Sequence, residues 1–329
     1  MRPIRRILVA VKDPGANTLP AVAKAARIAR ACGAHLELFH ALKASVWANN
    51  STAYETAVFD LQQTQGQQYL QRLGRIAARV RLHGIQVTTA VEYDYPAYDA
   101  IVRRAKAISA DLIVAGRSGG SLLKLTDWEL LRQSPIPVLL VKKSGPYRHP
   151  NVLAAVDPCR AHSKPAQLDL EILGVAEQIS TALKGKLHAV HAYAPVVMGA
   201  AAASIGDDVA ARLDGIAASN ARTELERLLE GIAIPRPRRH LVGNLPGPAI
   251  NEVARRIRAQ IVVMGALSRT GLKRLIIGNT AERVMDDLPC DILIVKPTQF
   301  VCQVPARARG PRLRTSSGQM TSQPPLPGR

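Results

Sequence analysis

Short runs of hydrophobic residues alternate with amphipathic stretches along most of the chain. In the first half the runs lie at 7–11, 34–41, 85–91, 110–116 and 134–142, and a stretch of helical periodicity separates each run from the next. The run at 110–116 is apolar at almost every position, which is typical of a strand buried on both faces of a parallel sheet. The pattern predicts five strands connected by four helices.

The second half of the chain repeats this pattern, because residues 152–297 carry the same landmarks in the same order as residues 7–143. Both halves begin with a strand that leads into Asp-Pro, and the first half has an additional residue, Lys12, at this point. Strands that alternate with helices require a parallel sheet with right-handed crossovers. The sequence therefore predicts the α/β class, with two tandem flavodoxin-like, Rossmann-related domains at 1–149 and 150–298. Each is expected to be a five-stranded parallel sheet with helices on both faces.

The pattern stops near Pro297. Residues 299–329 contain five arginines, five prolines and no acidic residue. Such a segment cannot bury enough apolar surface to order itself, so we expect a disordered, basic, Pro/Ser-rich tail.

Composition and charge narrow the class of protein. Hydrophobic residues make up 47% of the chain and aromatic residues only 4%, which indicates an aliphatic interior. No apolar run reaches the length of a membrane span, and the N-terminal residues lack the features of a signal peptide, so a cytoplasmic protein is expected. The four cysteines are far apart in sequence and show neither a metal half-site nor a disulfide framework. The net charge of +19, concentrated in the first half and the tail, favours anionic partners.

Candidate chemistry lies after the fourth strand of the second half. Met264 and Gly265 end that strand, and Gly278, Asn279 and Thr280 begin the helix that follows the loop. A glycine lets an anion approach the backbone, and the unpaired N–H groups of a helix start carry the positive end of the helix dipole. This arrangement predicts a phosphate site.

At these residues the chain resembles the tandem-domain universal stress proteins, over everything except the tail. Nucleotide-binding members of that family have Gly-x-x-Gly, nine residues, and then Gly followed by Ser, Thr or Asn. The second half has Gly265-Ala266-Leu267-Ser268, nine residues, and then Gly278-Asn279. The spacing matches, whereas Ser268 replaces the second glycine.

The resemblance implies that ATP or a related adenine nucleotide, with or without Mg²⁺, binds across the ends of strands one and four in the second domain. Asp157 would then hold the adenosine, Ala192 would contribute a backbone contact, and the loop from Gly265 to Thr280 would hold the phosphates. It also implies a stress-response regulator rather than an enzyme, with weak ATP hydrolysis left open.

The first half departs further from this motif. It keeps Gly116-Arg117-Ser118-Gly119, but nine residues further on it has Trp128-Glu129 instead of a glycine. We therefore interpret the first half as a degenerate domain that does not bind nucleotide.

Three other features of the sequence allow further interpretations. The segment 116–120 also spells the G-x-S-x-G of a hydrolase nucleophile elbow, for which Asp127 and His149 would follow in the order of a triad. The apolar stretch 195–200 indicates either a packed loop or part of a module that binds a hydrophobic ligand or a protein partner. His40 and His191 end equivalent strands, which we attribute to packing.

The fifth strands, at 138–141 and 292–295, are aliphatic and would leave exposed sheet edges. Pairing of the two domains about a pseudo-two-fold axis would cover them, and a further homodimer stays open.

The basic tail predicts salt-dependent contact with polyanions. Each phosphate contact contributes roughly 0.9 to the slope of log K against log salt on duplex DNA. Removing residues 299–329 should flatten that slope, measured by nucleic-acid retention at about 50 and 200 mM salt. If the truncated chain binds as tightly as the full chain and with the same salt dependence, the polyanion site lies in the first half instead.

Overall fold

The computed structural model describes residues 3–42, 52–117, 125–159, 167–195, 207–266 and 285–306, together with 315–316 and 319–320. The chain forms two compact units. Arg2–Pro146 and Val301–Arg329 make up the first, and Tyr147–Phe300 makes up most of the second.

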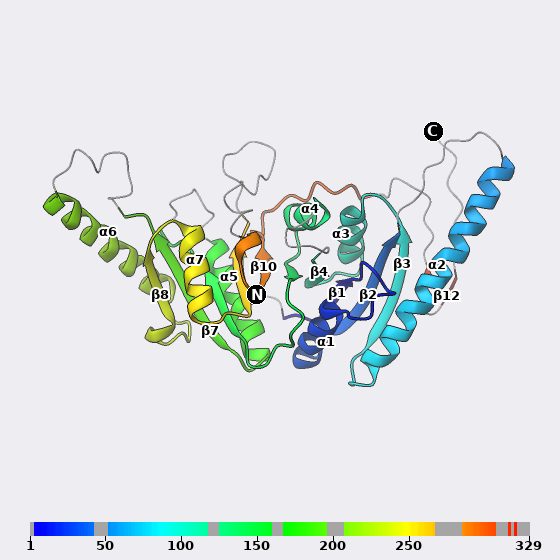
Figure 1. Cartoon of the computed structure of the whole chain (residues 1–329), viewed down its shortest axis with the longest axis horizontal. Helices are drawn as coiled ribbons and strands as arrows, with labels where there is room; N and C mark the ends of the chain where they lie inside the picture. The colour runs from blue at the N-terminus through cyan, green and yellow to red at the C-terminus, as the bar shows by residue number, and fades with distance from the viewer. Residues whose placement is uncertain are drawn as a thin grey trace. The chain divides into compact units, whose positions relative to one another are not determined.

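The first unit alternates strands and helices as the sequence predicts (Figure 1). Its elements are β1 (Arg6–Ala10), α1 (Pro20–Cys32), β2 (His35–Leu42), α2 (Thr52–Arg81), β3 (Val87–Tyr93), α3 (Ala97–Ala107), β4 (Leu112–Gly116), α4 (Leu125–Gln133) and β5 (Val138–Val141). The five strands are parallel, in the order β3-β2-β1-β4-β5. Because right-handed crossovers run in both directions from β1, α1 and α2 cover one face and α3 and α4 the other.

The second unit repeats the arrangement. Its elements are β6 (Asn151–Ala155), α5 (Gln167–Ala182), β7 (Lys186–Tyr193), α6 (Asp207–Leu228), the 3₁₀ helix η3 (Arg236–Arg238), β8 (Arg239–Gly243), α7 (Pro246–Arg256), β9 (Ile261–Gly265) and β10 (Asp291–Val295). Its parallel strands lie in the order β8-β7-β6-β9-β10. The prediction of two tandem α/β domains is confirmed.

Burial explains why these segments form strands. In β1 and β4, residues such as Ile7, Val9 and Ile113 are completely buried, because helices cover both faces of the sheet. Helix α1 begins at Pro20, whose fixed φ suits the first helical turn. It ends before Gly33, which takes the left-handed conformation at φ 64°.

Four residues of the tail are ordered as strands. Strand β11 (Thr315–Ser316) pairs antiparallel with β3, and β12 (Gln319–Met320) pairs with β11. The expectation of disorder throughout 299–329 therefore needs correction at these positions. The physical reason is that β3 is the edge of its parallel sheet, where unpaired N–H and C=O groups accept a further strand.

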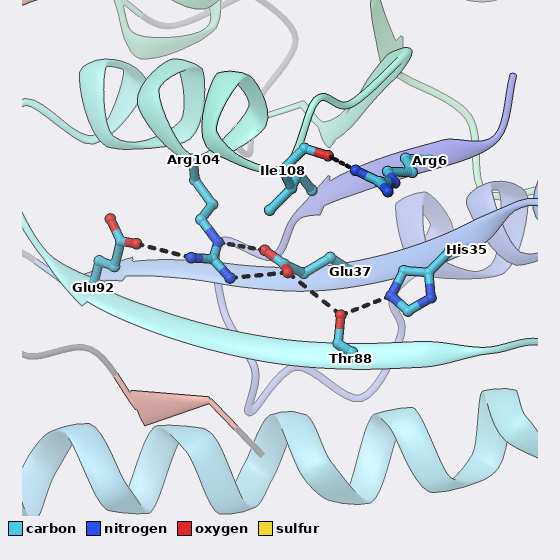
Figure 2. A network of polar contacts seen from close by, with 7 residues as sticks. All are labelled: Arg6, His35, Glu37, Thr88, Glu92, Arg104 and Ile108. Atoms are coloured by element: carbon cyan, nitrogen blue, oxygen red, sulfur yellow. Dashed lines mark hydrogen bonds and ion pairs between the residues drawn. The ribbon is translucent and has the colours of Figure 1, made fainter. Parts of the chain in front are cut away.

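A buried ion pair joins α3 to the sheet of the first unit (Figure 2). The guanidinium of Arg104 donates from Nε to Glu37 Oε1 at 2.6 Å and from Nη2 to Oε2 at 3.0 Å, and both residues are about 95% buried. Glu92 Oε1 lies 3.5 Å from Arg104 Nη1, and the Thr88 hydroxyl donates to Glu37. Although burial lowers the pKa of Arg104, the bonds to Glu37 outweigh it and raise the pKa above the usual value.

We predict that Arg104→Met destabilises the first unit by about 3–5 kcal/mol, because it leaves the Glu37 carboxylate buried without its cation. The double substitution Glu37→Leu/Arg104→Met should recover much of that loss. Arg227→Met removes an exposed pair with Glu224 and should cost less than about 1 kcal/mol. Urea unfolding measures all three, and a loss for Arg104→Met as small as that for Arg227→Met would contradict the assignment.

Candidate functional site

The register of the second sheet places four of the sequence-predicted residues at one edge. Ala155, the last residue of β6, lies opposite Val190 of β7 and Met264 of β9, and β7 continues beyond this level to Tyr193. Asp157 and Ala192 follow two residues after Ala155 and Val190, and Gly265 ends β9. The edge of the sheet therefore carries Asp157, Ala192, Met264 and Gly265, all of them partly exposed.

Asp157 is held at this edge through its backbone. Its N–H donates to Oδ1 of Asp169 at 3.0 Å, and Asp169 is a buried residue in the first turn of α5. The Asp157 side-chain carboxylate has no hydrogen bond or ion pair within the described part of the chain. Sequence reasoning missed Asp169, although an acid in the first turn of a helix is a recognisable signal. The arrangement fixes the main chain and leaves the Asp157 carboxylate able to accept hydrogen bonds.

Gly265 has a packing role that the sequence did not reveal. A Cβ at this position would lie 2.8 Å from Cδ2 of Leu168 and 3.2 Å from Cδ1 of Ile172 on α5. The bare Cα of Gly265 therefore leaves the space that α5 needs. At the equivalent Gly116, the nearest described atom to a Cβ would be Ala21 Cβ, at an ordinary 3.7 Å.

The remaining predicted residues of the phosphate loop, Ser268, Gly278, Asn279 and Thr280, lie outside the described residues. The same holds for Ser118 and for most of the apolar stretch 195–200, of which Pro195 alone is described and half-buried.

The equivalent edge of the first unit has a lysine in place of the aspartate. Val11 donates its N–H to Phe39 at 2.8 Å, just as Val156 donates to Val190 at 3.0 Å, so the two valines are equivalent. Lys12 therefore stands at the position of Asp157 instead of being an added residue. Its ammonium forms an ion pair with the carboxylate of Asp127, which is 1% exposed. A cation with a buried partner thus replaces the acid.

His40 and His191 occupy equivalent structural positions. His40 Nδ1 lies 2.6 Å from the Val11 carbonyl, and His191 Nδ1 lies 3.3 Å from the Val156 carbonyl. Because a carbonyl only accepts, Nδ1 donates in each case. Burial lowers the pKa of His40, although the Val11 carbonyl and Asp13 act in the opposite direction. Both imidazoles tie the end of strand two to strand one, which supports a packing role.

The neighbouring Cys159 does not have the electrostatics of a nucleophile. Its Sγ lies 3.4 Å from His191 Nε2, but burial and the negative charges of Asp157 and Glu224 raise the pKa of the thiol. A raised pKa keeps the thiol protonated near neutral pH, and a thiol is a weaker nucleophile than a thiolate.

The remaining members of the hydrolase triad make other contacts. Asp127 pairs with Lys12, and His149 Nδ1 lies 3.0 Å from the Lys184 carbonyl. Within the described residues no group of three His, Cys, Asp or Glu side chains is arranged to hold a metal ion. No helix in the described ranges is both long and apolar enough to cross a membrane.

A pair of histidines forms a second polar cluster in the second unit. The rings of His188 on β7 and His240 on β8 stack with centroids 5.4 Å apart, and His188 Nδ1 lies 3.1 Å from His240 Nε2. Burial, followed by the nearby charges of His240, Arg238 and Lys186, lowers the pKa of His188 to about 4. Burial and Arg256 also lower the pKa of His240.

Comparison with known proteins gives a consistent result for both units. The sequence profile described as "Universal stress protein family" matches residues 3–142 and 150–296. Universal stress protein E of Photorhabdus laumondii is 26% identical over 68% of this chain and 73% of its own length. The universal stress protein E homolog of Haemophilus influenzae is 31% identical over 53% of this chain and 56% of its own length.

Solved structures share the fold. A functionally unknown protein from Pseudomonas aeruginosa PAO1 superposes with a TM-score of 0.69 at 24% identity, covering 92% of this chain and 95% of that protein. A universal stress protein from Archaeoglobus fulgidus gives a TM-score of 0.61 at 16% identity, covering 88% and 98%.

The histidine pair predicts that acid destabilises the second unit. Below about pH 6.5 the unfolded chain binds a proton at His188 that the folded protein does not bind. The contribution of His188 to the free energy of unfolding is therefore complete above pH 6.5 and falls as the pH drops towards about 4. We expect the fall in Tm between pH 7 and pH 4.5 to be smaller by roughly 5 °C in His188→Leu. His83→Leu, an exposed control in the turn after α2, should follow the wild type. An equal fall in His188→Leu and wild type would refute the assignment.

Proposed function

The chain belongs to the universal stress protein family, with two of its domains in tandem, and on this basis we propose that its second unit binds ATP or a related adenine nucleotide. The observation that carries the proposal is the register of the sheet, which brings Asp157, Ala192 and Gly265 to one edge, at the carboxyl ends of β6 and β9. In open parallel α/β sheets, ligands bind beyond the carboxyl ends of the strands, where the strand order reverses. In this unit the reversal lies between β6 and β9.

The side chains at this edge suit the sugar and base of a nucleotide. The Asp157 carboxylate has no described partner and would accept hydrogen bonds from ribose hydroxyls, and the partly exposed Ala192 would offer its backbone. The packing of α5 covers the Cα of Gly265, so the phosphates, with or without Mg²⁺, would depend on Ser268 and on Gly278 to Thr280.

The first unit offers a contrast within the same chain. The Lys12 and Asp127 ion pair stands where the second unit has Asp157, so the acid that would hold the sugar is missing there. We therefore propose one nucleotide for each chain, bound by a stress-response regulator without turnover. Binding would report or buffer the state of the cell.

Titration calorimetry of the full chain with ATP tests the proposal. We expect one site at micromolar or weaker affinity, and at least tenfold weaker binding, about 1.4 kcal/mol, for Asp157→Asn. The matched control is Asp13→Asn, which changes the acid beside Lys12 in the first unit and should leave the affinity unchanged.

Two sites per chain, or equal affinity of Asp157→Asn and wild type, would contradict the proposal. Phosphate release in the same samples distinguishes binding from hydrolysis.

A further inference from the structure

The first unit contains a groove between α1 and α2 that is unrelated to the nucleotide site. It has a volume of about 950 Å³ and runs from the loop at 14–17 along both helices to Ile85. Buried aliphatic residues form its floor, among them Val22 of α1 and Val80 of α2.

The walls of this groove are strongly basic. Its five arginines are Arg27 and Arg30 on α1 and Arg72, Arg75 and Arg79 on α2. All five are exposed, and among the described residues no lysine, aspartate or glutamate lines the groove. Helical spacing explains why the arginines of each helix face the same groove, because residues three or four apart share a face of a helix. We call this feature the arginine groove.

The guanidinium groups of the arginine groove have no acidic partner among the described residues. Within the described part of the chain, none of the five forms an ion pair with a carboxylate. Arg72 lies over the ring of Tyr69, whose centroid is 5.3 Å from Cζ. Other arginines of the same unit, such as Arg104, are paired with acids. Five positive charges that lack a described acidic partner and lie close together repel one another, and an anionic ligand would relieve that repulsion.

We propose that the arginine groove binds the phosphodiester backbone of a single-stranded nucleic acid. Arginine clustered along helices is the electrostatic footprint of nucleic-acid binding. Its planar fork recognises phosphate in a bidentate way that lysine cannot reproduce. The axial rise of 1.5 Å per residue spreads Arg72, Arg75 and Arg79 over about 10 Å along α2. This wall of the groove therefore suits an extended anion better than a single phosphate.

The recessed shape favours a single strand over a duplex. The floor lies between two helices, where unpaired bases or sugars can pack against Val22 and Val80 and stack on guanidinium planes. Described residues with phenyl or indole rings do not line the groove, so the site should tolerate any sequence and depend mainly on charge.

Salt dependence tests the proposal quantitatively. On single strands each phosphate contact contributes about 0.7 to the slope of log K against log salt, so five arginines predict a slope near −3.5 from the groove. Fluorescence anisotropy with a labelled dT oligonucleotide, using the full chain, measures this slope. Arg72→Gln/Arg75→Gln/Arg79→Gln should make the slope shallower by about 2 and weaken binding at least tenfold at low salt.

The second unit supplies a matched control. Helix α6 is the counterpart of α2, and its exposed arginines Arg212, Arg222 and Arg227 do not line the groove. Replacing these three by glutamine removes the same charge and should change the slope by much less. Circular dichroism checks that both triple variants are folded.

Three outcomes would overturn the proposal. Equal slopes for the two triple variants would mean that net charge or the tail accounts for binding. Tighter binding of a duplex than of the single strand would exclude the recessed site. Displacement of the oligonucleotide by poly-glutamate at equal charge concentration would assign the arginine groove to acidic protein segments.

ATP titration of Arg72→Gln/Arg75→Gln/Arg79→Gln should match the wild type, so this proposal and the nucleotide proposal fail independently.

Discussion

Each unit depends on burying both faces of a parallel sheet. Crossover helices lie on the two faces, so β1, β4 and their counterparts β6 and β9 must be aliphatic along most of their length. A polar side chain inside a unit then needs a polar partner. The polar pair of Glu37 and Arg104 is accommodated inside because each charge meets the other in bidentate geometry.

This constraint explains how two similar units can carry different chemistry. Substitutions at the ends of the strands leave the core runs untouched, so Lys12 and Asp157 can occupy equivalent positions on equivalent backbones. The same freedom applies to the outer helix faces. Helix α2 contributes three arginines to the groove, whereas α6 pairs Arg227 with Glu224 on its own surface.

The two proposed sites lie in different units and bind their ligands through different interactions. The edge of β6, β7 and β9 offers one carboxylate and backbone groups, which suits recognition of an uncharged sugar by directed hydrogen bonds. The arginine groove offers charge with little directionality, which suits a repeating polyanion whose binding releases counterions. A protein with a net charge of +19 can therefore combine a selective site with a general one.

The order of strands and helices could be predicted from the sequence alone, since hydrophobic periodicity is a local property that the duplication shows twice. The position of Asp157 and Gly265 at strand ends followed from the same pattern. Contacts between distant residues could not be predicted. Arg104 lies 67 residues from Glu37, and the steric need for Gly265 comes from Leu168 on another element. Arg27 and Arg75 line one groove that neither helix forms alone. Side-chain direction and helix packing decide such contacts, and both exist only once the chain has folded.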